Sequence, residues 1–140
     1  MKKIVSLVLV LAMALICSAA FAEGGIPADQ IKVGYIYIGD ENEGYTAAHY
    51  EGAKEMMAEL GLSEDQVIIK WNIPETEEAY DAAVDLAEAG CNIIFANSFS
   101  FESYVIQAAS EYPDVQFCHA TGFQAASSGL SNMHNYFTSI

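Results

Sequence analysis

The sequence predicts an α/β fold of three layers, in which helices cover both faces of a parallel β-sheet. Four apolar, strand-like runs alternate along the chain with three segments of helical periodicity. The strand-like runs are almost continuously apolar, a pattern typical of strands that are buried on both faces. Helices between such strands supply the long crossovers that parallel pairing requires, and these crossovers are right-handed by default.

The first strand-like run, residues 31–38, leads into the part of the chain where we expect a ligand. Gly39 ends this run, and the acidic loop 40–44 follows it. A helical pattern then opens at Tyr45, with small or apolar residues every three or four positions, and stops at Gly61. Ligands of open parallel sheets bind outside the carboxyl ends of the strands. The loop from Gly39 to Tyr45 is therefore the first candidate binding loop.

The rest of the chain repeats this plan of strand, loop and helix. Pro74 and Pro113 separate elements, because proline disfavours helix for the residue before it. Thr76 and Ser100 are the expected N-caps of two helices, since their hydroxyl groups can accept a helix N–H bond. The expected strands are 67–71, 91–96 and 115–118, and the two helices should end at Gly90 and Tyr112.

Packing expectations follow from these elements. Trp71 should pack at the sheet edge, because its strand is outermost in the expected strand order 2-1-3-4. Residues 124–140 have weak periodicity and receive no element assignment. The second helix should bury Tyr80, Ala83, Val84 and Ala87.

Residues 1–22 predict a cleaved secretory signal peptide. Lys2 and Lys3 precede a short apolar run, and the small-residue site Ala20-Phe21-Ala22 follows it. The run is shorter than the ~20 apolar residues that span a bilayer. A lipid anchor at Cys17 is the less favoured alternative, because Ile16 stands where lipoprotein signals carry a small residue. We expect an exported protein, located in the periplasm or at the outer face of the cytoplasmic membrane.

The charge of the chain excludes several classes of partner. The formal net charge is -14, and removal of Lys2 and Lys3 with the signal peptide takes it to -16. The remaining fixed cations are Lys32, Lys54 and Lys70, and the sequence contains no arginine. Such a surface repels phosphate backbones, so we expect no nucleic-acid partner. It also disfavours a highly anionic ligand, because no arginine fork is available to bind one.

The two cysteines that follow the signal peptide are predicted to be free, buried thiols. Cys91 should begin one strand and Cys118 should end the next parallel strand. An offset of several residues at ~3.3 Å each exceeds the ~7 Å limit between the Cα atoms of a disulfide.

The main competing class is an enzyme, for instance an exported flavodoxin-like hydrolase. The sequence has no G-x-S-x-G elbow, no phosphate loop and no G-x-G-x-x-G motif. Cys118 and His119 are strand neighbours and point to opposite faces, so they cannot form a nucleophile–base pair. His49, His119 and His134 lack the close pairing of zinc ligands. The acidic loop 40–44 could bind a hard cation, but a solvated loop is favoured. We expect no catalytic residue, metal or cofactor.

Several short motifs resemble those of one known family. They are Val33 to Gly39, Gly44-Tyr45-Thr46 with His49 and Gly52, Ile94 to Phe99, Tyr112 to Phe117, and His119-Ala120-Thr121-Gly122. In this order and spacing they are similar to the basic-membrane-protein family, the purine nucleoside receptor (PnrA)-like substrate-binding proteins of ABC transporters. The resemblance runs from about Lys32 to Tyr136. Departures are Tyr45, where the family often has tryptophan, and a loop about one residue shorter.

The resemblance implies a lobe like that of periplasmic binding protein type I. Family members are much longer and close two lobes on a ligand, so residues 32–140 would form an incomplete first lobe behind a linker at 23–31. The implied function is extracytoplasmic binding of a purine nucleoside or nucleobase for uptake. The implied partners are an ABC permease and the C-terminal lobe of the same protein. An exported ligand-sensing lobe that serves a membrane receptor is the alternative.

Residues at the expected strand ends are the candidate ligand contacts. Tyr45 could stack on a ligand or only fasten the start of its helix to the core. Asn97 and Ser98 could bind a ligand or cap the following helix, and His119 could satisfy local backbone groups. The full candidate set is Asp40, Tyr45, Asn97, Ser98, Phe99, His119 and Thr121.

Overall fold

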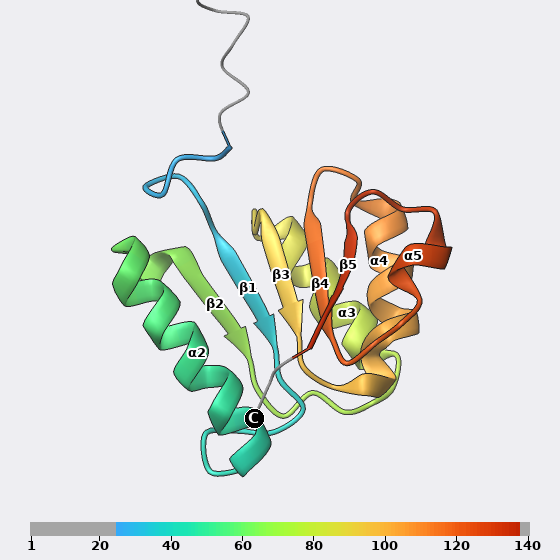
Figure 1. Ribbon diagram of the computed structural model, residues 1–140, viewed down its shortest axis with the longest axis horizontal. Coiled ribbons are helices and arrows are strands. Elements are labelled where there is room, and N and C mark those ends of the chain that lie inside the picture. The colour runs from blue at the N-terminus through green and yellow to red at the C-terminus, as the bar shows by residue number, and fades with distance from the viewer. Residues whose placement is uncertain (1–24, 138–140) are drawn as a thin grey trace, which may run out of the picture.

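The computed structural model describes residues 25–137 (Figure 1). The predicted signal peptide and the Cys17 alternative lie outside the described residues. Within the part that is described, no helix is both long and apolar enough to cross a membrane.

The core of the fold is a five-stranded parallel sheet with the strand order β2-β1-β3-β4-β5 (Figure 1). This confirms the predicted parallel α/β sheet and the edge position of the second strand. The fifth strand extends the sheet beyond the predicted order, and it comes from the segment to which no element was assigned. The strands are β1 Val33–Ile36, β2 Val67–Lys70, β3 Ile93–Ala96, β4 Gln116–Ala120 and β5 Met133–Tyr136.

Helices lie on both faces of the sheet, as Figure 1 shows. One face packs against α2, where Val33, Tyr35 and Tyr37 of the first strand segment meet Ala53 of the helix. The opposite face packs against α3 and α4. The helices are α2 Gly44–Leu60, α3 Glu78–Glu88, α4 Glu102–Glu111 and the short α5 Ala125–Ser128, with 3₁₀ turns η1 at Glu64–Gln66 and η2 at Phe99–Phe101.

Small side chains bring α3 and α4 close to the sheet. A Cβ atom on Gly34 of β1 would lie 3.0 Å from Cδ1 of Leu86, so glycine at this position lets the α3 leucine reach the strand. The buried residues of α3 are Ala79, Ala82, Ala83 and Leu86. Of the predicted set, Ala83 is fully buried, and Tyr80, Val84 and Ala87 are partly buried against the same core.

Both predicted N-caps are wrong. α3 begins at Glu78, and the Thr76 carbonyl instead accepts the backbone N–H of Ala79 in a tight turn. Ser100 lies inside the 3₁₀ turn η2, which delays the start of α4 to Glu102. In both places a turn after the strand loop takes the hydrogen bonds that a side-chain cap would have supplied.

Trp71 packs at the sheet edge, as predicted. Its ring centroid lies 5.1 Å from that of Tyr37 and 5.0 Å from that of Tyr50. These aromatic contacts fasten the end of β2 to the α2 side of the core.

The two cysteines are free, as predicted. Cys91 is buried, but it precedes β3 rather than beginning it. Cys118 is only half-buried, so the prediction of a buried thiol is wrong for this residue. Burial nevertheless raises the pKa of the Cys118 thiol to about 11, which keeps it protonated at neutral pH.

Leu86→Ala should lower the free energy of unfolding by about 2–5 kcal/mol, because the leucine is fully buried between α3 and β1. Leu60→Ala is the matched control, since Leu60 is 52% exposed at the end of α2. Urea unfolding of the two variants measures the difference. Equal losses in both variants would contradict this description of the core.

Candidate ligand-binding site

An open cleft of about 550 Å³ lies at the carboxyl edge of the sheet. The loops that follow β1, β3 and β4 form its walls. β1 and β3 are neighbours in the sheet, but the chain leaves β1 toward β2 and leaves β3 toward β4. Their carboxyl ends therefore form the topological switch point, where such sheets bind ligands. The cleft is lined by Ile38, Gly39, Glu43, Tyr45, Asn97, Ser98, Phe99 and Thr121.

Asn97 joins three of the elements around this cleft. Its side chain is fully buried. Oδ1 accepts the Ile38 backbone N–H at 3.0 Å, and Nδ2 donates to Oγ1 of Thr46 at 3.2 Å. Its backbone carbonyl accepts the hydroxyl of Tyr45 at 2.6 Å. Because Oδ1 and Nδ2 both bond within the protein and the side chain has no exposed surface, Asn97 shapes the cleft rather than contacting a ligand directly.

Tyr45 stands at the mouth of the cleft, at the beginning of α2. Its ring is 41% exposed, and its edge-on contact with His49 has a centroid distance of 4.7 Å. Glu43 caps the helix, since its carboxylate accepts the N–H groups of Tyr45 at 2.8 Å and Thr46 at 2.7 Å. These hydrogen bonds lower the pKa of Glu43. The ionised cap and the bond from Tyr45 to Asn97 together fix the position of the ring.

Ser98 and Phe99 follow β3 on the other side of the cleft. Ser98 is buried, and its hydroxyl donates to Glu75. Phe99 is 57% exposed. Tyr45 and Phe99 are therefore the cleft residues with large exposed rings.

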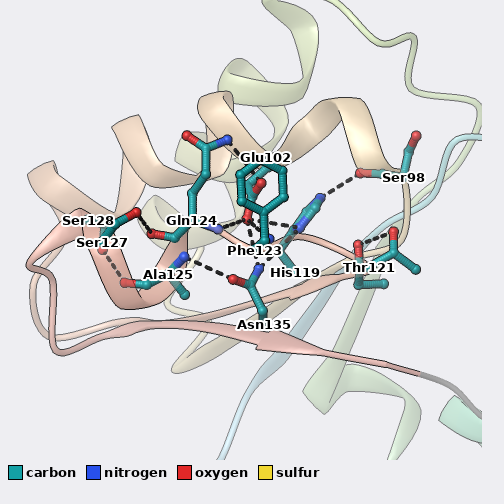
Figure 2. A network of polar contacts seen from close by, with 11 residues as sticks. Ser98, Glu102, His119, Thr121, Phe123, Gln124, Ala125, Ser127, Ser128 and Asn135 are labelled. Atoms are coloured by element: carbon teal, nitrogen blue, oxygen red, sulfur yellow. Dashed lines mark hydrogen bonds and ion pairs between the residues drawn. The ribbon is translucent and has the colours of Figure 1, made fainter.

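His119 lies beneath this loop and is fully buried (Figure 2). Its Nε2 atom is 2.6 Å from the Ser98 carbonyl, which requires that Nε2 carry the proton. Nδ1 then faces the Nδ2 donor of Asn135 at 3.5 Å. Burial lowers the pKa of His119, against the opposing effects of Ser98 and Glu102. His119 is thus neutral at pH 7, and its Nε2–H group holds the Ser98 carbonyl in place.

Glu102 is a buried carboxylate in the same network (Figure 2). Oε1 accepts the backbone N–H groups of Phe123 and Gln124, each at 2.8 Å, and Nδ2 of Asn135 at 2.9 Å. Oε2 accepts Nε2 of Gln124 at 3.0 Å. Burial alone would raise the pKa of Glu102, but hydrogen bonds from Gln124 and Asn135 hold it below its usual value.

The turn after β4 passes close to this network. Thr121 has a left-handed backbone, with φ 63°, and its side chain reaches the cleft. Gly122 follows, and a Cβ atom there would collide with Glu102 Oε1, His119 Nδ1 and Asn135 Nδ2. Glycine is required here because the polar groups occupy the space of a side chain.

The cleft brings together five of the seven predicted site residues, namely Tyr45, Asn97, Ser98, Phe99 and Thr121. Asp40 does not line it. Its carboxylate accepts the N–H of Asn42 within the acidic loop, beside a separate depression that includes Trp71. His119 has no exposed surface.

Sequence reasoning missed Glu43, Glu102 and Phe123. Glu43 stands two positions before Tyr45, where an acidic cap is a recognisable signal. Glu102 looked like an ordinary acidic residue at a helix start, and nothing in the sequence indicated its burial. Phe123 lies in the turn after β4, outside any expected element. In the described residues no cluster of three histidine, cysteine or acidic side chains could hold a metal ion.

A parallel α/β lobe with an aromatic cleft at its switch point is the architecture of a ligand-binding lobe. The family model described as "ABC transporter substrate-binding protein PnrA-like" matches residues 31–138. The chain therefore belongs to this family of ABC transporter substrate-binding proteins, which confirms the resemblance of its motifs.

Individual proteins agree with this assignment. The chain is 34% identical over 111 residues to a purine-binding protein of Brucella abortus (strain 2308). The aligned region covers 77% of the chain and 31% of that relative. An ABC transporter solute-binding protein from Conexibacter woesei DSM 14684 has the same fold, with a TM-score of 0.66 and 22% identity over 76% of the chain and 35% of the other.

A transcriptional activator of the comK gene from Bacillus halodurans is also similar, with a TM-score of 0.55 and 26% identity over 65% of the chain and 30% of the other. The chain thus spans about a third of the length of each of these proteins, by the 31%, 35% and 30% that are covered.

Gly122→Ala should destabilise the protein by about 1–3 kcal/mol or more, because the added methyl group overpacks the buried network. Gly52→Ala is the control, since open space surrounds that position in α2. The control should stabilise the protein by about 0.5–1 kcal/mol through the better helix propensity of alanine. Thermal unfolding compares the two, and a neutral Gly122→Ala would contradict the described geometry.

Proposed function

We propose that this chain forms one wall of an extracytoplasmic cleft that binds a neutral purine nucleoside or nucleobase for uptake by an ABC transporter. The observation that carries the proposal is the pair of exposed rings, Tyr45 and Phe99, at the switch point of the sheet. Flat aromatic bases stack on such rings without needing a buried charge. The name of the Brucella relative, a purine-binding protein, supports the same ligand class.

The charge of the cleft supports a neutral ligand. Its lining contains Glu43 and no lysine or arginine. Because Glu43 is held ionised by the helix N–H groups that it caps, the local charge is negative. A phosphate group on the ligand would meet this charge without a cation to offset it.

A second lobe and a membrane permease are the proposed partners. A small ligand is normally buried over 70–90% of its surface, which an open cleft on one lobe does not achieve. The match covers only 31% of the Brucella protein, so most of that relative lies outside the matched region. We propose that further chain supplies the opposite wall, and that the lobe works outside the cytoplasmic membrane, following the export signal predicted at residues 1–22.

Binding rather than catalysis is the proposed role of the site. The Ser98 hydroxyl in the cleft lining donates to Glu75, while His119 contacts the Ser98 carbonyl oxygen. This arrangement does not activate a nucleophile, because the base does not face the hydroxyl.

Ligand sensing is a second candidate function. The likeness to a transcriptional activator from Bacillus halodurans favours it, because a regulatory protein has a similar lobe. A permease and an ATPase encoded beside this gene would favour uptake, whereas a neighbouring membrane receptor would favour sensing.

Tyr45→Ala in the full-length protein should weaken purine binding by about one to two orders of magnitude, because a stacked ring contributes ~1–3 kcal/mol per base. Tyr45→Trp should keep or improve affinity, since the larger ring still stacks. Calorimetric titration with adenosine measures both. A lower melting temperature with unchanged affinity for Tyr45→Ala would show that the tyrosine only fastens its helix to Asn97.

Adenosine should bind more tightly than adenosine monophosphate, because the phosphate would face an acidic cleft without an arginine. A competition assay on the full-length protein compares the two ligands at the same ionic strength. Tighter binding of the monophosphate would show the charge argument to be wrong.

A further inference from the structure

Two exposed phenylalanine rings stack beside the cleft. Phe99 is 57% exposed and Phe123 is 71% exposed, and their ring centroids are 6.3 Å apart at an interplanar angle of 29°. Phe99 lines the cleft, and Phe123 lies on the adjacent loop. Single exposed apolar side chains are ordinary on protein surfaces. A stacked pair at the edge of a binding cleft indicates a function more specifically than a single exposed ring does. Each ring restricts the movement of the other, and both keep free surface.

The loop that bears Phe123 is held by a buried charge. Its backbone N–H donates to Oε1 of Glu102 at 2.8 Å, and so does the next N–H, of Gln124 (Figure 2). Glu102 is 2% exposed and has no lysine or arginine partner in the described part of the chain; its Oε1 atom lies 3.9 Å from Nδ1 of His119. Burying an ionised carboxylate is costly unless hydrogen bonds satisfy it. If the loop moved away, Glu102 would lose the bonds from Phe123 and Gln124 and keep only the donor of Asn135.

The loop that bears Phe99 is tied to the same network. The carbonyl oxygen of Ser98, which precedes Phe99, is 2.6 Å from Nε2 of His119. On its other side, the His119 ring meets Asn135, whose Nδ2 also donates to Glu102. Figure 2 shows these contacts converging from three segments of the chain. One buried polar cluster thus fixes the backbones beneath both rings.

We propose that Phe123 extends the aromatic wall of the cleft through Phe99, and that Glu102 is the positioning residue for this wall. Phe123 braces Phe99 so that the Phe99 ring presents its face to a flat ligand, opposite Tyr45. Glu102 acts indirectly, because it holds the Phe123 loop beside the Phe99 ring. The inference rests on the proposed function, since the ligand that it positions is the planar base.

Calorimetric titration of the full-length protein with adenosine tests this assignment. Phe123→Leu should weaken binding about tenfold with little change in melting temperature, because it removes an exposed ring. Phe123→Tyr keeps a flat ring and should restore affinity. Glu102→Gln should weaken binding by a similar factor, and Glu111→Gln, at the exposed far end of the same helix, should change nothing.

The double variant Glu102→Gln with Phe123→Leu separates positioning from general stability. If Glu102 acts through Phe123, the double variant loses less affinity than the two single losses combined. Additive losses, or Phe123 variants that bind as the wild type does, would overturn the inference; the Phe123 variants decide the matter if Glu102→Gln does not fold. Absence of any purine binding by the wild-type protein would instead refute the proposed function itself.

Discussion

The side chain of Asn97 is the constraint on which the cleft depends. It is the first residue after β3, and it accepts the N–H of Ile38 just beyond β1 while donating to Thr46 in α2. The backbone ladder between β1 and β3 pairs Ile36 with Ala96 and ends with the bond from the Asn97 N–H to the Ile36 carbonyl. Beyond that point, the buried Asn97 amide holds the β1 loop against α2. Because the amide also occupies a position with no exposed surface, loss of either bond would leave a buried polar group unpaired, at a cost of about 1–3 kcal/mol.

Asn97 also connects the two aromatic walls of the cleft. Its carbonyl receives the Tyr45 hydroxyl on one side, and the chain continues through Ser98 to Phe99 on the other. Beneath the second wall, the buried side chains of His119 and Glu102 likewise bond to backbone groups and hold them in place. The buried Glu102 carboxylate accepts N–H donors rather than pairing with lysine or arginine, in a chain whose formal net charge is -14. The resulting site suits a flat, neutral ligand.

The fold followed from the sequence where apolar periodicity was strong. The first four strands, the three main helices and the edge position of Trp71 were predictable, because continuous apolar runs and glycine or proline breaks determine them. β5 was not, since His134 and Asn135 interrupt its apolar character. For the site, the rule that ligands bind at the carboxyl ends of parallel strands predicted the position of the cleft and five of its lining residues. It also included Asp40 and His119, because sequence order cannot show whether a strand-end side chain faces the cleft, an adjacent loop or the core.

The most direct test of this account is hydrogen exchange at the Ile38 amide, measured by NMR. Ile38 lies beyond β1, so its N–H is protected only if the Asn97 side chain accepts it as the structure indicates. We expect this amide to exchange as slowly as those of β1 in the wild type. In Asn97→Ala, its exchange should accelerate toward loop rates. Fast exchange in the wild type, or unchanged protection in the variant, would contradict the claim that Asn97 shapes the cleft.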